Sequence, residues 1–190
     1  MKEICIVLTH TGTILSKIIK KYTKDEFSHV SISLDVELKE MYSFGRLNPY
    51  NPFWGGFVHE EIHKGTFKRF YKTKSKIYLL KITEEQYEDL KNNIKQIEQE
   101  KEKYKFNIMG LLAVGFHRKI GKTHSFYCAE FVKYVMEKSN INTKLPDIVK
   151  PEDFKNLEKA EVIYEGLLKS YQTSKMTLGY IRKKKLLPYH

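Results

Sequence analysis

Residues 28 to 35, SHVSISLD, alternate between polar and apolar side chains. Val30, Ile32 and Leu34 would face one way in an extended chain, and the polar residues between them the other way. A period of two is typical of a strand with one face in a hydrophobic core. The segment therefore requires a sheet that is covered on one side, and other parts of the chain must supply its neighbouring strands and its cover.

Four further segments are predicted to be strands: residues 4–8, 39–45, 77–82 and 161–164. The first is a continuous apolar run, which suits a buried strand. The second follows SHVSISLD closely and is expected to form a hairpin with it. Residues 48–56 are rich in Pro, Gly and Asn, a composition that predicts a loop.

Helical signals separate these strands. Residues 14–19 have apolar side chains at helical spacing, and Thr83 to Gln86 form a capping box that opens an amphipathic helix to about residue 103. Another amphipathic helix is predicted from about residue 125 to 138, and Pro151 starts a short one over 151–154.

The chain of 190 residues fits one domain, with 41% hydrophobic residues and no linker that would divide it. We expect an α+β fold over residues 1–180, in which an antiparallel sheet packs against a cysteine-bearing helix, followed by a basic C-terminal tail over 181–190. The first residues lack the long apolar core of a signal peptide, and two cysteines are too few for a disulfide framework. We expect a cytoplasmic protein.

The formal net charge is +11. Such a charge favours weak contact with an anionic membrane or wall polymer. The lysines are scattered along the chain, and no nucleic-acid-binding motif accompanies them, so no specific nucleic-acid binding is predicted.

Residues 59–63, HEEIH, match the H-E-x-x-H pattern of zinc proteases. That pattern binds zinc when a helix places both histidines on one face and the Glu beside the bound water. Gly55 and Gly56 precede the match and Gly65 follows it, which leaves room for about two helical turns at most. We therefore expect a charged surface segment here, with no metal and no cofactor.

Residues 124–138, HSFYCAEFVKYVMEK, place Cys128 in the first turn of an amphipathic helix. The partial positive charge of a helix N-terminus favours a thiolate, and a neighbouring imidazole would complete its activation as a nucleophile. Burial as a small apolar residue is the alternative for Cys128, and it is the expected state of Cys5 in the first strand.

His29 is the preferred partner for Cys128, because it lies at the start of a strand among small serines that leave room for a substrate. His10 and His124 are alternatives, and an isolated histidine can also bond only to backbone or solvent. If the hairpin turn centres on Val36, Ser43 lies opposite His29 and its hydroxyl can orient the imidazole.

The motifs SHVSI at residues 28–32 and FYCAEFV at 126–132 together resemble the circularly permuted papain-fold amidases of the YiiX type. These are relatives of the NlpC cell-wall peptidases in which the histidine precedes the cysteine. The segments at 41–46 and 151–154 also look like uncharacterised bacterial members of this group, so that the resemblance spans about residues 4–166.

The resemblance implies a papain-like core of the permuted NlpC type, with a cysteine-bearing helix on an antiparallel sheet whose strands carry the histidine and a third polar residue. Cys128 would be the nucleophile and His29 the base. Members often have an acidic third residue shortly after the histidine strand, where this chain has Ser43. This departure implies a weaker enzyme, a different orienting group or a loss of catalysis.

We therefore expect a cysteine hydrolase, an amidase or peptidase that acts on a small-molecule, peptide or lipid-like acyl substrate through an acyl-enzyme. Arg46 is a candidate partner for a substrate carboxylate, and Tyr42 and Tyr127 are candidates for the walls of the cleft, although solvation and core packing also explain these three residues. The alternatives are a lipid-directed thioesterase or acyltransferase on the same fold, and a catalytically inactive binding protein.

Overall fold

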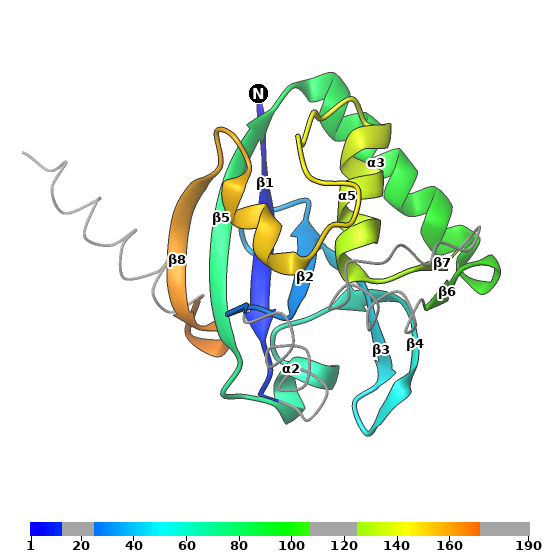
Figure 1. Ribbon diagram of the computed structural model, residues 1–190, viewed down its shortest axis with the longest axis vertical. Coiled ribbons are helices and arrows are strands. Elements are labelled where there is room, and N and C mark those ends of the chain that lie inside the picture. Colours follow the sequence, from blue (N-terminus) through cyan, green and yellow to red (C-terminus); the bar gives the residue numbers. More distant parts are fainter. Residues whose placement is uncertain (13–24, 107–124, 172–190) are drawn as a thin grey trace, which may run out of the picture.

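The structure, a computed structural model, describes residues 1–12, 25–106 and 125–171, except for the side chains of residues 52 and 53 (Figure 1). The helix predicted at residues 14–19 and the basic tail at 181–190 lie outside this part of the chain.

A six-stranded sheet forms the centre of the described fold, with strand order β4-β3-β2-β1-β5-β8 and every neighbouring pair antiparallel. The strands are β1 (Lys2–His10), β2 (His29–Ser33), β3 (Met41–Asn48), β4 (Asn51–Glu60), β5 (Lys74–Ile82) and β8 (Glu161–Leu167). All five predicted strands are present, and the antiparallel sheet with its few helices confirms the α+β class.

The loop predicted at residues 48–56 was wrong. Only Pro49 and Tyr50 form a turn, and the rest of this segment belongs to β4, which pairs with β3. Glycine is compatible with a strand here because Gly55 lies against the Phe106 ring, where a Cβ atom would come within 2.6 Å of the ring carbons. The glycine that favoured a loop therefore permits close packing in a strand.

Three α-helices accompany the sheet in the described ranges: α2 (Gly65–Arg69), α3 (Glu84–Gln99) and α5 (Cys128–Lys138). The capping box of α3 is confirmed, because the Thr83 hydroxyl accepts from the Gln86 backbone N–H and the Gln86 side chain accepts from Thr83. The 3-10 turn η1 (Lys101–Lys103) continues α3 to the predicted end.

Helix α5 begins at Cys128, three residues later than predicted. The preceding residues form the short strand β7 (Ser125–Phe126), which pairs in parallel with β6 (Lys105–Phe106). The short helix predicted at 151–154 is the 3-10 helix η2 (Pro151–Asn156), and another 3-10 turn, η3 (Leu168–Ser170), follows β8.

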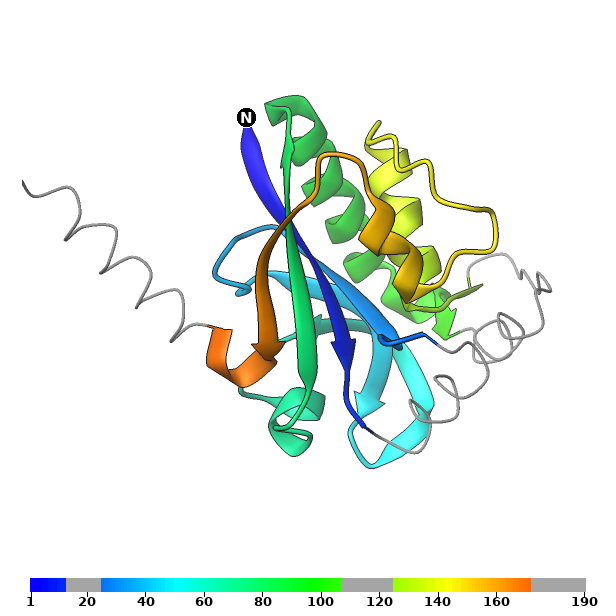
Figure 2. The same cartoon turned by 60° about the vertical axis from the view of Figure 1, so that its left-hand side comes forward.

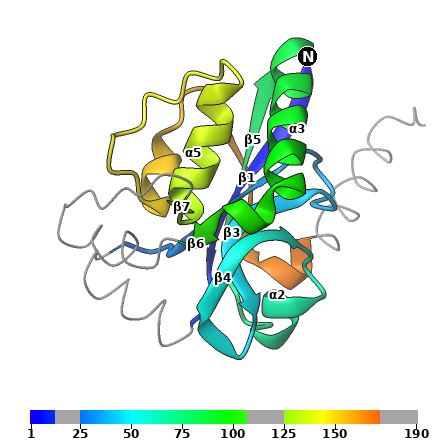
Figure 3. The same ribbon diagram turned by 90° about the vertical axis from the view of Figure 1, so that its right-hand side faces the viewer.

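Helices α3 and α5 cover one face of the sheet, as Figures 1 and 3 show. Apolar side chains of β1, β2, β3 and β5 pack there against both helices in the larger core cluster. Helix α2 and η3 pack on the opposite face over a smaller cluster, which includes Val7, Met41, Phe67 and Leu168 (Figure 2). The sheet is therefore covered on both sides.

Covering both faces changes the environment of β2. The alternation predicted one buried and one exposed face, but Ser31 and Ser33 are fully buried on the second face. The reason is the position of β2 inside the sheet, between β1 and β3. Its polar side chains therefore lie in a covered layer, where they need hydrogen-bonding partners.

No helix in the described ranges is both long enough and apolar enough to cross a membrane.

Replacing Phe131 with alanine should lower the free energy of unfolding by about 3–5 kcal/mol. The Phe131 ring is fully buried and lies 5.2 Å from the Phe44 ring and 5.7 Å from the Phe57 ring, so its removal leaves a cavity where α5 meets β3 and β4. Urea unfolding measures the change. Trp54→Ala, which removes an aromatic ring that is 59% exposed, is the control and should change stability by less than about 0.5 kcal/mol.

Candidate active site

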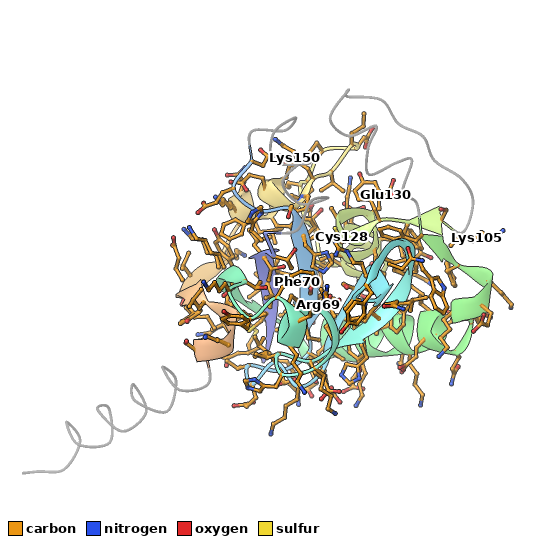
Figure 4. All side chains as sticks on the ribbon, turned by 90° about the horizontal axis from the view of Figure 1, so that it is seen from below. Arg69, Phe70, Lys105, Cys128, Glu130 and Lys150 are labelled. Carbon is orange, nitrogen blue, oxygen red and sulfur yellow. The ribbon has the colours of Figure 1, made fainter. Side chains whose placement is uncertain are left out.

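Cys128 is the first residue of α5, at the end of the helix where backbone N–H groups lack intrahelical partners. The helix start is held by Tyr127, whose backbone N–H donates to Glu130 Oε2 at 3.1 Å and whose hydroxyl donates to the Val149 carbonyl at 2.7 Å. Cys128 is only 3% exposed and belongs to the larger core cluster. In Figure 4, which views the molecule from below, α5 is seen end-on with Cys128 near the centre.

His29 is the first residue of β2, where it pairs with Thr9 of β1. Its imidazole lies close enough to the Cys128 thiol for the two side chains to interact and for Cys128 to help raise the pKa of His29. Its Nε2 atom lies 3.0 Å from Glu60 Oε1, so Nδ1 is the ring nitrogen left for the thiol. The predicted pair of Cys128 and His29 is therefore brought together, although 99 residues separate the two in sequence.

The Glu60 carboxylate is held by both of its oxygens. Oε1 meets His29, and Oε2 accepts a hydrogen bond of 2.5 Å from the Ser31 hydroxyl. The Ser31 hydroxyl also lies 3.3 Å from His29 Nε2. With 19% of the His29 side chain and 10% of the Glu60 side chain exposed, this pair is shielded from most solvent competition.

The environment favours the charged forms of both His29 and Glu60. Burial alone would lower the pKa of His29, but attraction to Glu60 and Cys128 and hydrogen bonds with both outweigh it and raise the pKa from 6.5 to about 10. Burial alone would raise the pKa of Glu60, but the His29 charge and the hydrogen bonds from His29 and Ser31 hold it below 4.5. At neutral pH the site contains an imidazolium and a carboxylate.

Glu60 belongs to the HEEIH match, but not in the geometry of a zinc protease. The match runs from the end of β4 into a turn, so no helix places the two histidines on one face. His59 points away from Glu60, stacks on Tyr42 at 4.9 Å and has its Nε2 2.8 Å from the Lys39 carbonyl. The interpretation of the whole segment as charged surface was wrong for Glu60.

Within the described residues, no group of three or more His, Cys, Asp or Glu side chains is placed to hold a metal ion.

The hairpin register behind the Ser43 prediction was also wrong. Ile32 pairs with Tyr42 and Ser33 with Met41, so the turn centres on residue 37 and not on Val36. The longer turn is closed by the Asp35 carboxylate, which accepts from the backbone N–H groups of residues 39 and 40. Ser43 is therefore level with residue 31, and Gly45 is level with His29.

Gly45 gives the imidazole its room. A Cβ atom at this position would lie 3.4 Å from His29 Cε1, 3.7 Å from Glu60 Oε1 and 3.3 Å from Ser43 Oγ. A larger side chain would therefore press on the hydrogen-bonded pair.

Ser43 itself is fully buried. Its hydroxyl has no hydrogen-bond partner of regular geometry among the described residues, but it lies close enough to Glu60 to help lower the pKa of that carboxyl. The group that orients His29 in the structure is Glu60. The sequence contained a signal for Glu60, because this residue ends the run FVHE that follows Gly55 and Gly56. The loop predicted over residues 48–56 hid the strand β4 that contains this run.

The three residues predicted to bind substrate do not surround Cys128. Tyr42 packs on β4 through His59 and Phe57, and Tyr127 is a 2% exposed anchor of the helix start. Arg46 is half-buried, with its guanidinium carbon 5.8 Å from the Phe70 ring centre, and it lines a cavity of about 230 Å³ that Glu60 also borders. Of these three residues, only Arg46 lines a cavity that a residue of the site, Glu60, also lines.

The alternative histidines have different settings. His10 follows Thr9 at the end of β1, and its Nδ1 lies 3.3 Å from the Ser28 hydroxyl. His124 lies outside the described residues.

No model of a known protein family matches this sequence, and no curated protein matches it. The chemistry of the site must therefore be argued from its own geometry, in which the thiol lies at a helix N-terminus, the imidazole on β2 and the carboxylate on β4, on either side of β3.

The pKa of His29 provides the first test of this geometry. Titration followed by the NMR signals of the His29 ring should give a midpoint well above 6.5, because Glu60 and Cys128 favour the imidazolium. Glu60→Gln should lower the midpoint by about 1–3 pH units. Ser43→Ala is the control and should leave it nearly unchanged; the opposite order of effects would show that Ser43 is the orienting group.

Stability should depend on pH through the same pair. Because the folded-state pKa of His29 exceeds 6.5, its stabilising contribution is full below pH 6.5 and is lost as pH rises through the folded-state pKa. Glu60 has the opposite sign, with a contribution that is present above pH 4.5 and lost as pH falls. In the Cys128→Ser background, the unfolding free energy should therefore decline as pH rises above 6.5, and Glu60→Gln should flatten that decline. Equal slopes in urea unfolding would contradict the pairing.

Proposed function

We propose that this protein is a cysteine hydrolase, an amidase or peptidase that cleaves an acyl bond through an acyl-enzyme at Cys128. The observation that carries the proposal is the position of His29, which interacts with the Cys128 thiol and has its Nε2 atom 3.0 Å from the Glu60 carboxylate. A cysteine activated by an imidazole that a third group orients is the recurring arrangement of cysteine hydrolases.

The first half of the reaction forms the acyl-enzyme. The Cys128 sulfur, as a thiolate beside the His29 imidazolium, attacks the substrate carbonyl carbon, and the carbonyl π electrons move onto its oxygen. When the tetrahedral intermediate collapses, the bond to the leaving group breaks and His29 gives it a proton. An amine leaves and a thioester remains on Cys128.

The second half releases the acid. The neutral His29 takes a proton from a water molecule as its oxygen attacks the thioester carbonyl. Collapse of the second tetrahedral intermediate breaks the carbon–sulfur bond and restores the thiolate and the imidazolium. Glu60 keeps its negative charge throughout, holding the ring by Nε2 so that Nδ1 faces the sulfur.

The start of α5 supplies stabilisation for the oxyanion. The backbone N–H of Cys128 is the first of the helix and has no intrahelical acceptor, so it can donate to the negative oxygen of either intermediate. The helix dipole adds a partial positive charge at the same place.

A permuted papain-like core is part of this proposal. An antiparallel sheet carrying the histidine, a helix that begins with the cysteine, and a histidine that precedes the cysteine in sequence all support it. Glu60 also supports it, because the resemblance implies an acidic third residue, which at Ser43 seemed to be missing. The case for an inactive binding protein rested on that missing carboxylate and is weakened accordingly.

Iodoacetamide tests the activated thiol without requiring the natural substrate. Alkylation of Cys128 at pH 7, followed by mass spectrometry of its tryptic peptide, should be slowed at least about tenfold by His29→Ala or Glu60→Gln. The first change removes the imidazolium beside the thiol, and the second removes the carboxylate that favours the imidazolium. Ser43→Ala is the matched control and should stay close to the wild-type rate. Because Cys128 is 3% exposed, the variants are compared with one another and not with a free thiol.

Turnover of 4-nitrophenyl acetate tests the second half. An acetyl group should be found on Cys128, and His29→Ala should slow turnover by about 10²–10⁴-fold, as expected for loss of a general base. Equal alkylation and equal turnover in the wild type and His29→Ala would refute the proposed role of the pair.

A further inference from the structure

We propose that the surface formed by the β3–β4 hairpin tip and α2 docks on an anionic lipid bilayer. This inference is independent of the reaction at Cys128. The hairpin surface is defined here by four exposed apolar or aromatic side chains and three cations around them: Leu47, Tyr50, Trp54, Tyr71, Lys68, Arg69 and Lys72.

The apolar part of the hairpin surface is unusually exposed. Leu47 is 48% exposed, Tyr50 75%, Trp54 59% and Tyr71 54%, although side chains of this size are normally buried in part by their neighbours. Three of them lie within eight residues at the hairpin tip, which projects from the lower end of the sheet in Figure 1. Large apolar side chains gathered at a protruding tip mark an interaction surface.

The same surface is cationic. Residues 46–74 contain six lysines and arginines and only two carboxylates, Glu60 and Glu61. Glu60 is paired with His29 and Glu61 with Lys64, so neither offsets the cations of α2. The Arg69 guanidinium carbon lies 3.9 Å from the Tyr50 ring centre, which holds a cation next to the exposed aromatic group.

A lipid bilayer is the partner that fits both properties. Trp and Tyr prefer the region between lipid headgroups and acyl chains, because their rings are apolar with a polar end. Lysine and arginine next to them reach anionic headgroups, each adding about 1 kcal/mol, or about a fivefold gain in binding. An acidic protein or polysaccharide would satisfy the cations but would leave the exposed Trp and Leu without an apolar partner.

Docking in this orientation would bring the candidate active site toward the bilayer. The start of α5 is the end of that helix nearer the hairpin in Figure 1, and Figure 4 shows Cys128, Arg69 and Phe70 from below. A lipid-linked or membrane-proximal acyl substrate would then approach from the side toward which the start of α5 faces.

Trp54 is the chain's only tryptophan, so intrinsic fluorescence reports directly on the hairpin tip. With vesicles of phosphatidylglycerol and phosphatidylcholine at low salt, the full-length protein should co-sediment and its emission should shift to the blue. Lipids brominated on the acyl chains should quench that emission. Vesicles of phosphatidylcholine alone should bind far more weakly, since the headgroup attraction is missing.

Two charge variants separate the hairpin surface from the general positive charge. Lys68→Gln with Lys72→Gln should weaken partitioning roughly 25-fold, at about fivefold for each cation. Lys91→Gln with Lys95→Gln removes the same charge from the exposed side of α3 and should change partitioning by less than about fivefold. Trp54→Ala should weaken co-sedimentation while the fold is retained.

Three results would overturn the proposal: no co-sedimentation with anionic vesicles at low salt, vesicle binding without quenching of Trp54 by brominated lipid, or equal losses in the two double variants. A blue shift of Trp54 with soluble polyglutamate as large as with vesicles would also overturn it, in favour of an acidic macromolecular partner.

Discussion

The hydrogen-bonded pair of His29 and Glu60 is the interaction on which the arrangement of the site depends. A buried charge is costly unless an opposite charge and hydrogen bonds compensate it. Here the imidazolium and the carboxylate compensate each other, and Ser31 binds the second carboxylate oxygen. The pair joins β2 to β4 across β3, so it forms only when all three strands are in the observed register.

The two faces of the sheet have different tasks. The face under α3 and α5 is apolar and holds the helices by burial, which fixes where α5 begins and therefore where Cys128 lies. The opposite face has a polar band of small side chains, including Ser31 and Ser43, next to its apolar cluster. Small residues and Gly45 leave space for an imidazole and a carboxylate that larger side chains would occupy.

Several features of the chain were predictable because they are local. The alternation at residues 28–35, the apolar run at 4–8 and the capping box at Thr83 each depend on a few neighbouring residues, and the corresponding elements exist as expected. The proximity of Cys128 and His29 was also predictable, because a cysteine at a helix start and a histidine among serines are candidates for a thiol–imidazole pair before any contact is known.

The sequence alone identified Cys128 and His29 as candidates for the proposed nucleophile and base, and it determined which segments alternate or form amphipathic helices. Tertiary structure decided the third member of the site. Ser43 was predicted in place of Glu60 for two reasons. The hairpin register was off by two residues, and the glycines of β4 led to the prediction of a loop where a strand lies. The register of the β2–β3 hairpin depends on the turn that Asp35 closes, and the place of β4 beside β3 depends on the ring of Phe106 against Gly55. Neither contact can be read from the local sequence.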